Sequence, residues 1–347
     1  CCYPDPGSQP ISPIATSVTQ SPSYNFMAQP DTSNSAVWLV LLDCLPPHFP
    51  DSSAASAATA ATAADNPAWH PCDDLDAQGV CFEQYYSQNP TAHCSVADYL
   101  GGAEAFRIFL NRLQAAGKGC HYRTLDAIQP SATPHESGLL VFTASGCDCP
   151  ETLATALLQI RSLHAQHSEP QHRPALIITS IKGVSRPLPE HFDCPCTESE
   201  IRVPLWILAN HLQAARIQML CGSHDLLATI ADLLALPDHP EIPGALPSQN
   251  TTHRPNTPRS LLQLSTLHPE SLERILTIHG NCWTGLRTQH YFLVQTPASQ
   301  LDTADSQNRR LFQKPDDYWN VNNCLSACEE IATAMLLAAG HSPGIPD

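Results

Sequence analysis

Cysteines follow three of the apolar segments of this chain. They are Cys44 after residues 36–42, Cys147 and Cys149 after 139–143, and Cys194 and Cys196 after 175–179. If the apolar segments are parallel strands, these thiols emerge at the carboxyl edge of one sheet, where sites form in α/β proteins. Thiols gathered there would bind zinc or form a redox pair. The alternative is separate small cysteines in loops or in the core, which the C-x-C spacing favours because common zinc modules use C-x-x-C.

The segments that would position these residues alternate between two periodicities. Continuous apolar runs indicate strands buried on both faces of a sheet. They lie at 36–42, 139–143, 175–179 and 203–208, with further strands expected at 80–86 and 121–125. Apolar residues at helical spacing indicate helices. These lie at 103–116, 151–167, 223–235 and 326–339. The alternation predicts an α/β fold with a mixed, mainly parallel sheet between helix layers.

Several residues predict where elements begin and end. Gly117 is expected to stop the helix at 103–116, and Ser223 to cap the helix at 223–235. Residues 285–294 are expected to form a strand or one arm of a hairpin. Residues 1–35 are rich in Pro, Ser and Gln and lack periodicity, which predicts a disordered or loosely attached arm.

The composition excludes some partners. Of the 347 residues 42% are hydrophobic and 14% charged, which is typical of a globular protein, and the formal net charge is −16. An acidic surface disfavours nucleic acid and anionic membranes, because both require basic patches. No apolar run reaches the ~18 residues of a membrane span. The 15 cysteines, without a secretory signal, are expected to be reduced thiols in a cytoplasmic protein.

Six segments in chain order carry a resemblance to a known family. The first is the strand 36–42 ending at Asp43, and the second is Asp73 to Phe82, similar to a "D-x-L-A-x-x-G-V-x-F" pattern. Leu176 to Gly183 stands where a strand is followed by "T-S-D-H-G". The remaining three are 198–205 like "E-x-x-I-R-V-P-L", 223–237 like "D-L-x-P-T-L-L-x-L-x-G-L-P", and 285–291 like "A-I-R-T-x-x-Y" followed by 311–317. With Trp319, Val321 and Asn322, this set resembles divergent bacterial, planctomycete-type members of the sulfatase family, in the alkaline phosphatase superfamily.

The resemblance implies a specific chemistry. Sulfatases hydrolyse sulfate esters with a formylglycine made from the cysteine of "C-x-P-x-R", and a divalent cation, usually calcium, holds the sulfate. The cation needs hard oxygen ligands, which the family takes from an Asp-Asp pair after the first strand and from the Asp of "S-D-H-G". The resemblance therefore assigns Asp43 as a metal ligand, Cys94 to the nucleophile position and Lys182 as an anion-binding residue.

The sequence departs from the family pattern at most of these positions. Cys44 replaces the second carboxylate, and Ile181 stands at the third ligand position with Lys182 at the neighbouring histidine position. In the nucleophile segment, Val96 occupies the proline place and Asp98 the arginine place. The loop 191–196 is shortened and lacks the clamping lysine that precedes the glutamate at position 198. These substitutions predict that Cys94 is not matured to formylglycine and that no cation is bound tightly.

These observations lead to one hypothesis and two alternatives. We expect a catalytically degenerate sulfatase homologue that acts in binding or regulation, holds an anionic or sulfated small ligand, and needs no cofactor. The alternatives are an active sulfate or phosphate ester hydrolase with a remodelled metal site, and a thiol-metal (zinc) or redox protein. Asp43 could instead end its strand without a ligand role, and Lys182 could be a solvated loop residue. We expect an arm at 1–35, an α/β domain at 36–265 and a C-terminal subdomain and tail at 266–347.

Overall fold

The computed structural model describes the greater part of the chain in eleven stretches. They are residues 36–44, 75–91, 94–124, 137–144, 150–166, 173–183, 196–237, 258–265, 274–297, 309–317 and 320–340. The predicted arm at 1–35 lies outside them, as do Cys147, Cys149, Cys194 and Trp319. No helix among the described residues combines the length and the apolar character that crossing a membrane requires.

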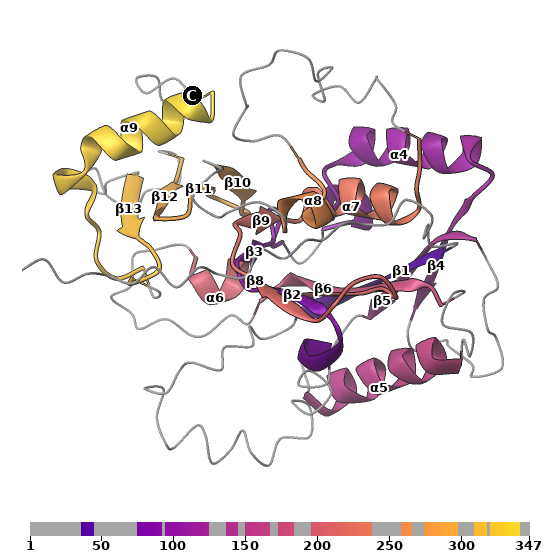
Figure 1. The fold of residues 1–347 in the computed structure, drawn as a ribbon. Helices are drawn as coiled ribbons and strands as arrows, with labels where there is room; N and C mark the ends of the chain where they lie inside the picture. The colour runs from indigo at the N-terminus through magenta and orange to yellow at the C-terminus, as the bar shows by residue number, and fades with distance from the viewer. Residues whose placement is uncertain are drawn as a thin grey trace, which may run out of the picture.

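A seven-stranded sheet forms the centre of the molecule (Figure 1). Its spatial order is β4 (Gly119–Thr124), β5 (Gly138–Ala144), β1 (Ala36–Cys44), β6 (Ala175–Lys182), β7 (Leu205–Leu208), β2 (Val80–Phe82) and β8 (Ala215–Ile217). The first four strands run parallel, β7 is antiparallel to both of its neighbours, and β8 is parallel to β2. β1 lies between two parallel partners, which explains its continuous apolar run: helices cover both of its faces.

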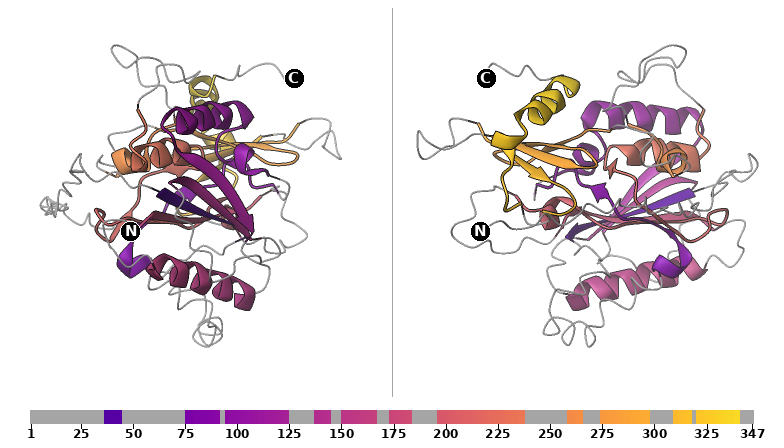
Figure 2. Two further views of the ribbon diagram at one scale, coloured as in Figure 1. Left: turned by 90° about the vertical axis from the view of Figure 1, so that its right-hand side faces the viewer. Right: turned by 60° about the vertical axis from the view of Figure 1, so that its left-hand side comes forward.

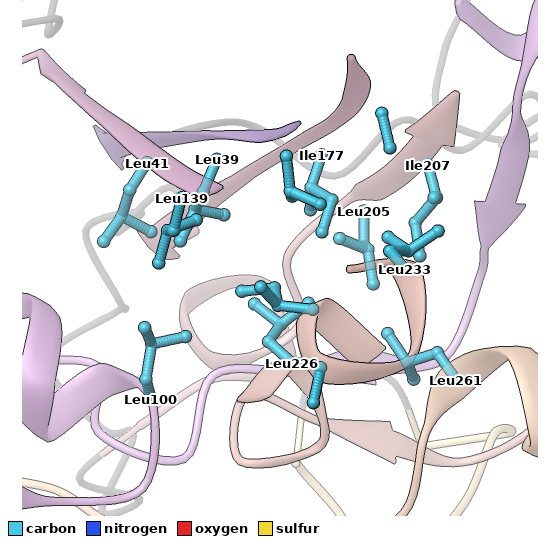
Figure 3. Packing of buried hydrophobic residues seen from close by; sticks show 14 of the residues in the cluster. Leu39, Leu41, Leu100, Leu139, Ile177, Leu205, Ile207, Leu226, Leu233 and Leu261 are labelled. Atoms are coloured by element: carbon cyan, nitrogen blue, oxygen red, sulfur yellow. The ribbon is translucent and has the colours of Figure 1, made fainter. Parts of the chain in front are cut away.

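Helices cover the two faces of this sheet in separate layers (Figure 1). One layer contains α3 (Val96–Tyr99), α4 (Ala103–Ala115), α7 (Asp225–Leu233) and α8 (Leu261–Leu264). The sheet residues of this core, among them Leu39, Ile177 and Ile207, face Leu226 and Leu233 of α7 (Figure 3). We call this set of packed side chains the upper core. The opposite face packs Trp38, Val40 and Leu42 against α5 (Pro150–Gln166), forming the lower core.

A second, antiparallel sheet lies at one side of the molecule (Figure 2). Its strands, in spatial order, are β10 (Leu276–His279), β11 (Thr284–Arg287), β12 (Tyr291–Gln295) and β13 (Arg309–Gln313). One face packs on residues of β3 (Tyr85–Tyr86), α6 (Glu198–Ile201) and the segment before β9 (Cys221–Gly222). The other face is covered by the 3₁₀ turn η5 (Leu325–Ala327) and by α9 (Glu329–Ala338).

The structure corrects three boundaries predicted from the sequence. The single strand expected at 80–86 is two strands, because residues 83–84 turn and β3 leaves the main sheet to pair with β9. Ser223 does not cap α7: His224 holds that position, and the Ser223 hydroxyl instead accepts a hydrogen bond from the Gln88 N–H. The terminal helix begins at Glu329 rather than at 326, after η5. The hairpin arm at 285–294 is confirmed as β11 and β12.

Candidate functional site

The carboxyl ends of β1 and β6 are adjacent, so the structure brings their polar residues to one edge of the sheet. Leu42 is paired with Ser180 and Cys44 with Lys182, which places Asp43 beside Ile181. Side chains alternate between faces along a strand. Leu41 belongs to the upper core and Leu42 to the lower core, so Asp43 and Ile181 lie on the upper face. By the same alternation Cys44 and Lys182 lie on the lower face.

The side chains of Ile181 and Cys44 both contact other residues of the protein. Ile181 is partly buried and packs against the upper core. The Cys44 thiol donates a hydrogen bond to the carbonyl oxygen of Gly183 at 3.2 Å, tying the ends of β1 and β6 together. A methyl group cannot coordinate a cation, and a thiol is a soft ligand that calcium does not prefer. Asp43 therefore remains as the carboxylate of this corner.

Cys94 lies at the start of α3, and its surroundings oppose ionisation. The side chain is half-buried and packs against the upper core, as do Val96 and Ala97. Burial, with a smaller contribution from Asp98, raises the pKa of the Cys94 thiol to about 12. Because the thiolate is the nucleophilic form, this cysteine is a poor nucleophile at neutral pH.

Asp98 has a local structural role. Its carboxylate accepts hydrogen bonds from the N–H and the hydroxyl of Ser95, at 3.3 and 2.6 Å, while the Ser95 hydroxyl accepts from the Asp98 N–H at 3.1 Å. This reciprocal pair is a capping box that fixes the first turn of α3. The residue at the arginine place of the nucleophile segment thus satisfies backbone donors.

A row of buried hydroxyl groups lies on the upper face of the sheet beside α3. The Tyr85 and Tyr99 hydroxyls are 3.0 Å apart, and the Tyr99 hydroxyl is 3.4 Å from that of Thr179. Thr179 in turn donates to the carbonyl oxygen of Pro204 at 3.0 Å. Burial raises the pKa of both tyrosines, so they remain neutral hydroxyls. Sequence reasoning missed this row, because its three hydroxyl groups come from three separate segments.

The strongest electrostatic feature is a buried ionic cluster between the two sheets, formed by Tyr86, Glu198, Arg287 and Lys314. Glu198 Oε1 accepts a hydrogen bond from the Tyr86 hydroxyl and lies 3.4 Å from Arg287 Nη2. Its Oε2 lies 3.3 Å from Lys314 Nζ. Both cations and the carboxylate are at most 2% exposed. Burial alone would raise the pKa of Glu198, but Arg287 and Lys314 outweigh burial and lower it to about 2.

Other contacts extend this cluster into the segment after β13. Lys314 also donates to the backbone oxygen of Asp317 and to the side chain of Asn320, whose amide donates to the Cys196 carbonyl oxygen at 3.0 Å. Burial lowers the pKa of Lys314 although Glu198 opposes that shift. The positive charges of Arg287 and Lys314 are therefore paired inside the protein. Sequence reasoning noted Glu198, Arg287 and Lys314 as parts of matched motifs, but the pairing of distant segments could not be read from spacing.

A second buried ion pair fixes the start of α7. Asp225 is 1% exposed and accepts two hydrogen bonds from Arg274, at 3.0 and 2.9 Å. Its carboxylate also accepts from the backbone N–H groups of Gly222 and Arg259, at 2.9 and 2.8 Å. All of these partners are structural, which gives this aspartate a role in holding three segments together.

The described residues do not assemble an evident metal centre. In the eleven stretches no three His, Cys, Asp or Glu side chains are grouped so that they could hold a metal ion. Of the cysteines proposed for zinc, Cys44 donates a hydrogen bond to Gly183 O, and Cys196 is buried in the apolar contact between the two sheets. The other three lie outside the described residues, so the thiol-metal hypothesis stays a prediction.

The three residues assigned from sequence therefore do not all share one face. Asp43 and Cys94 both lie on the upper side of the sheet, whereas Lys182 belongs to the lower side. The upper side also holds Ile181 and Val96, which are apolar. What the arrangement offers chemically is one carboxylate and neutral hydroxyl and thiol groups on one face, and one lysine on the other.

Comparison with known proteins identifies the fold. No family model and no curated protein sequence matches the chain. Among solved structures, BT4656, determined with its substrate D-glucosamine-2-N,6-O-disulfate, aligns with TM-score 0.63 at 10% identity over 89% of this chain and 97% of its own. This chain has the sulfatase-like fold of the alkaline phosphatase superfamily.

Two more structures with the sulfatase-like fold show its breadth. The 2-O GAG sulfatase BT1596 aligns with TM-score 0.56 at 10% identity over 89% of this chain and 90% of its own. The phosphonate monoester hydrolase SpPMH from Silicibacter pomeroyi aligns with TM-score 0.56 at 12% identity over 88% and 94%. The resemblance predicted from six sequence segments and the predicted fold class are both confirmed at the level of fold.

Proposed function

We propose that this chain is a degenerate sulfatase homologue that does not hydrolyse sulfate esters and acts by binding an anionic or sulfated small molecule. One observation carries the proposal. Cys94, Val96 and Ile181, at positions that the resemblance assigns to the nucleophile segment and to a metal ligand, pack against the upper core. Residues at positions that a sulfatase would use for its nucleophile, for maturation of that nucleophile and for its metal instead bury apolar surface, which stabilises the fold.

The nucleophile position and the metal-ligand positions both carry residues that disfavour catalysis. The raised pKa of Cys94 disfavours direct attack by its thiolate, and Asp98 would repel a sulfate where the family has a cation. Calcium takes roughly 6–8 oxygen ligands, including carboxylates. Ile181 is apolar, and the Cys44 thiol is hydrogen-bonded to Gly183 O. Of the three metal-ligand positions that the resemblance assigns, only Asp43 therefore supplies a carboxylate.

The class of ligand follows from the fold and from one cation. BT4656, which shares the fold, was solved with a disulfated glucosamine as its substrate. In this chain Lys182 stands at the end of β6, where the family places groups that contact sulfate, and it is only partly buried. An ammonium group at that edge would hold a sulfate or phosphate as a point charge. We therefore take sulfated monosaccharides as the first ligands to test.

A hydrolysis assay tests the loss of catalysis. Purified protein is incubated with 4-nitrophenyl sulfate and 4-nitrophenyl phosphate, each with added calcium, manganese or zinc, and release of nitrophenol is followed. The expected result is no turnover above that of the Asp43→Ala variant. The matched control is Asp232→Ala, an exposed aspartate on α7. Turnover that Asp43→Ala abolishes and Asp232→Ala preserves would overturn the proposal in favour of an active hydrolase with a remodelled metal site.

A titration tests the binding role separately. Glucosamine 6-sulfate is titrated into the protein by calorimetry or by NMR, with unsulfated glucosamine as the comparison ligand. Binding is expected for the sulfated sugar, weakened by Lys182→Ala. Lys118→Ala is the control, since Lys118 lies between α4 and β4 and the chain has only three lysines. Equal binding of both sugars, or equal loss in both variants, contradicts the assignment of Lys182.

A further inference from the structure

Two cysteines lie together at the junction of η5 and α9, on the face of the four-stranded sheet that α9 covers. Cys324 precedes η5, and Cys328 both ends η5 and caps α9. The Cys328 backbone N–H donates to the carbonyl oxygens of Cys324 and Leu325, at 3.0 and 3.1 Å. A helical turn of four residues rises about 6 Å, which lies inside the ~4.4–6.8 Å range of Cα separations found in disulfides.

The two cysteines lie one turn apart, and the thiol of Cys324 is anchored. Burial, with a smaller contribution from Cys328, raises the pKa of the Cys324 thiol, so its thiolate becomes available for exchange only at alkaline pH. The Cys324 thiol also contacts the carbonyl oxygen of Leu311 on β13, donating a hydrogen bond at 3.2 Å. Both side chains are half-buried against the apolar contact between the four-stranded sheet and α9, so a small oxidant can reach them.

We infer that Cys324 and Cys328 are a redox-active dithiol that forms a reversible intrachain disulfide with low-molecular-weight disulfides such as oxidised glutathione. This goes beyond the proposed function, because the pair lies outside the sulfatase-like edge of the sheet. Other described thiols are differently placed. Those of Cys44 and Cys221, for example, donate to the carbonyl oxygens of Gly183 and Met219, both at 3.2 Å.

The reaction proceeds by two exchanges. One cysteine, as the thiolate, attacks a sulfur of oxidised glutathione, forming a mixed disulfide and releasing one glutathione thiolate. The second cysteine loses its proton to solvent and attacks the protein sulfur of that mixed disulfide, releasing the second glutathione. Two protein thiols are oxidised to one disulfide, and oxidised glutathione is reduced to two glutathione molecules. The second step is favoured because the backbone hydrogen bond from Cys328 to Cys324 holds the two residues one turn apart, which corresponds to a high effective concentration.

The bond would lock one junction of the structure. The Cys324 N–H donates to Leu311 O at 2.8 Å, and the Leu311 N–H donates to Asn323 Oδ1 at 3.0 Å, so this turn is already tied to β13. A disulfide to Cys328 would connect the turn covalently to the N-cap residue of α9. Oxidation is therefore expected to slow hydrogen exchange of the first turns of α9, residues 329–338.

The sequence allows an unusually direct test. Trypsin does not cut between Lys314 and Pro315, so the peptide Leu311–Asp347 contains Cys324 and Cys328 and no other cysteine. The protein with the sequence printed above is reduced, equilibrated with oxidised and reduced glutathione at pH 8, alkylated and digested. The expected peptide 311–347 has lost two hydrogen atoms, carries no alkyl group, and regains two alkylation sites after reduction.

Two controls complete the experiment. The peptide Ile275–Arg287 contains Cys282 alone, a half-buried cysteine of the same sheet, and reports oxidation of a single thiol. Cys328→Ser should lose the bridged peptide and accumulate one glutathione on Cys324. The inference is overturned if wild-type peptide 311–347 remains doubly alkylated, or carries two glutathiones, under conditions that modify Cys282. Because the decisive measurement uses the wild-type chain, it does not depend on the folding of any variant.

Discussion

The edge formed by β1 and β6 and the buried ionic cluster between the two sheets carry opposite kinds of substitution. At the edge, positions that the resemblance assigns to metal ligands hold Ile181, which packs on the upper core, and Cys44, which donates a hydrogen bond to Gly183 O. In the cluster, Glu198, Arg287 and Lys314 are all charged and all buried. The charged residues of the cluster pair with one another inside the protein, whereas the edge holds apolar and thiol side chains at positions that the resemblance assigns to metal ligands.

The difference follows from the free energy of folding that is lost when a residue of each set is substituted. Removing one partner from a buried ion pair leaves an uncompensated charge in a region of low dielectric constant. Replacing an exposed metal ligand by an apolar residue that packs on the core carries no such penalty and adds buried apolar area. Substitution is therefore expected to cost more stability in the ionic cluster than at the edge. The predictions that follow test this contrast.

The largest effect is expected from Glu198→Ala. Removal of the carboxylate leaves Arg287 and Lys314 buried side by side, which should lower the free energy of unfolding by roughly 3–5 kcal/mol. Urea denaturation followed by circular dichroism measures the change. Glu104→Ala is the control, because it breaks an exposed pair with Arg107 on α4 and should leave the midpoint unchanged. Equal midpoints for wild type and Glu198→Ala would remove the cluster from the stabilising features of the fold.

The same carboxylate predicts a dependence of stability on pH. Its folded pKa of about 2 is below the ordinary value of 4.5, so its contribution is complete above pH 4.5 and is lost as pH falls towards 2. Unfolding free energies measured between pH 6 and pH 2 should fall more steeply in wild type than in Glu198→Gln. Parallel curves for the two proteins would contradict the lowered pKa.

A smaller loss of stability is expected at the edge formed by β1 and β6 when one carboxylate is placed there without the other metal ligands. Ile181→Asp places a carboxylate against the upper core, which should lower the free energy of unfolding by roughly 1–3 kcal/mol. Ile181→Val, as the matched control, should cost about 0.5–1.5 kcal/mol. Both are measured by urea denaturation, with and without calcium. Full recovery of Ile181→Asp by millimolar calcium would reveal a metal site that needs only one residue to be restored.

The smallest effect is expected at the cap of α3. Ser95→Ala removes the hydroxyl that accepts from the Asp98 N–H, and loss of such a cap typically costs about 1 kcal/mol. Thermal unfolding and the rate of Cys94 alkylation provide the measurements. Faster alkylation is expected as the first turn of α3 loosens, because the thiol is held half-buried by that turn. An unchanged rate would indicate that the upper core alone shields Cys94.

Much of the fold could be predicted from local pattern. The apolar run ending at Asp43 could belong only to a strand covered on both faces, and β1 has that position at the centre of the sheet. Gly117, with its positive φ of 67°, ends α4 where expected. The boundaries at Ser223 and at 326 were wrong because their local signals compete with contacts from distant segments, such as that of Gln88 with Ser223.

The candidate site was less predictable. The sequence determined which chemical groups are absent: no arrangement in space turns Ile181 into a ligand or Val96 into a proline. It did not determine that Lys182 and Asp43 lie on opposite faces, since that depends on the register of β1 with β6. It also did not indicate that Lys314 pairs with Glu198, because the strength of an ionic contact depends on burial and distance between segments over a hundred residues apart. Residue types decided which chemical groups stand at the positions that the resemblance singles out, and tertiary packing decided where the charges and thiols of this protein meet.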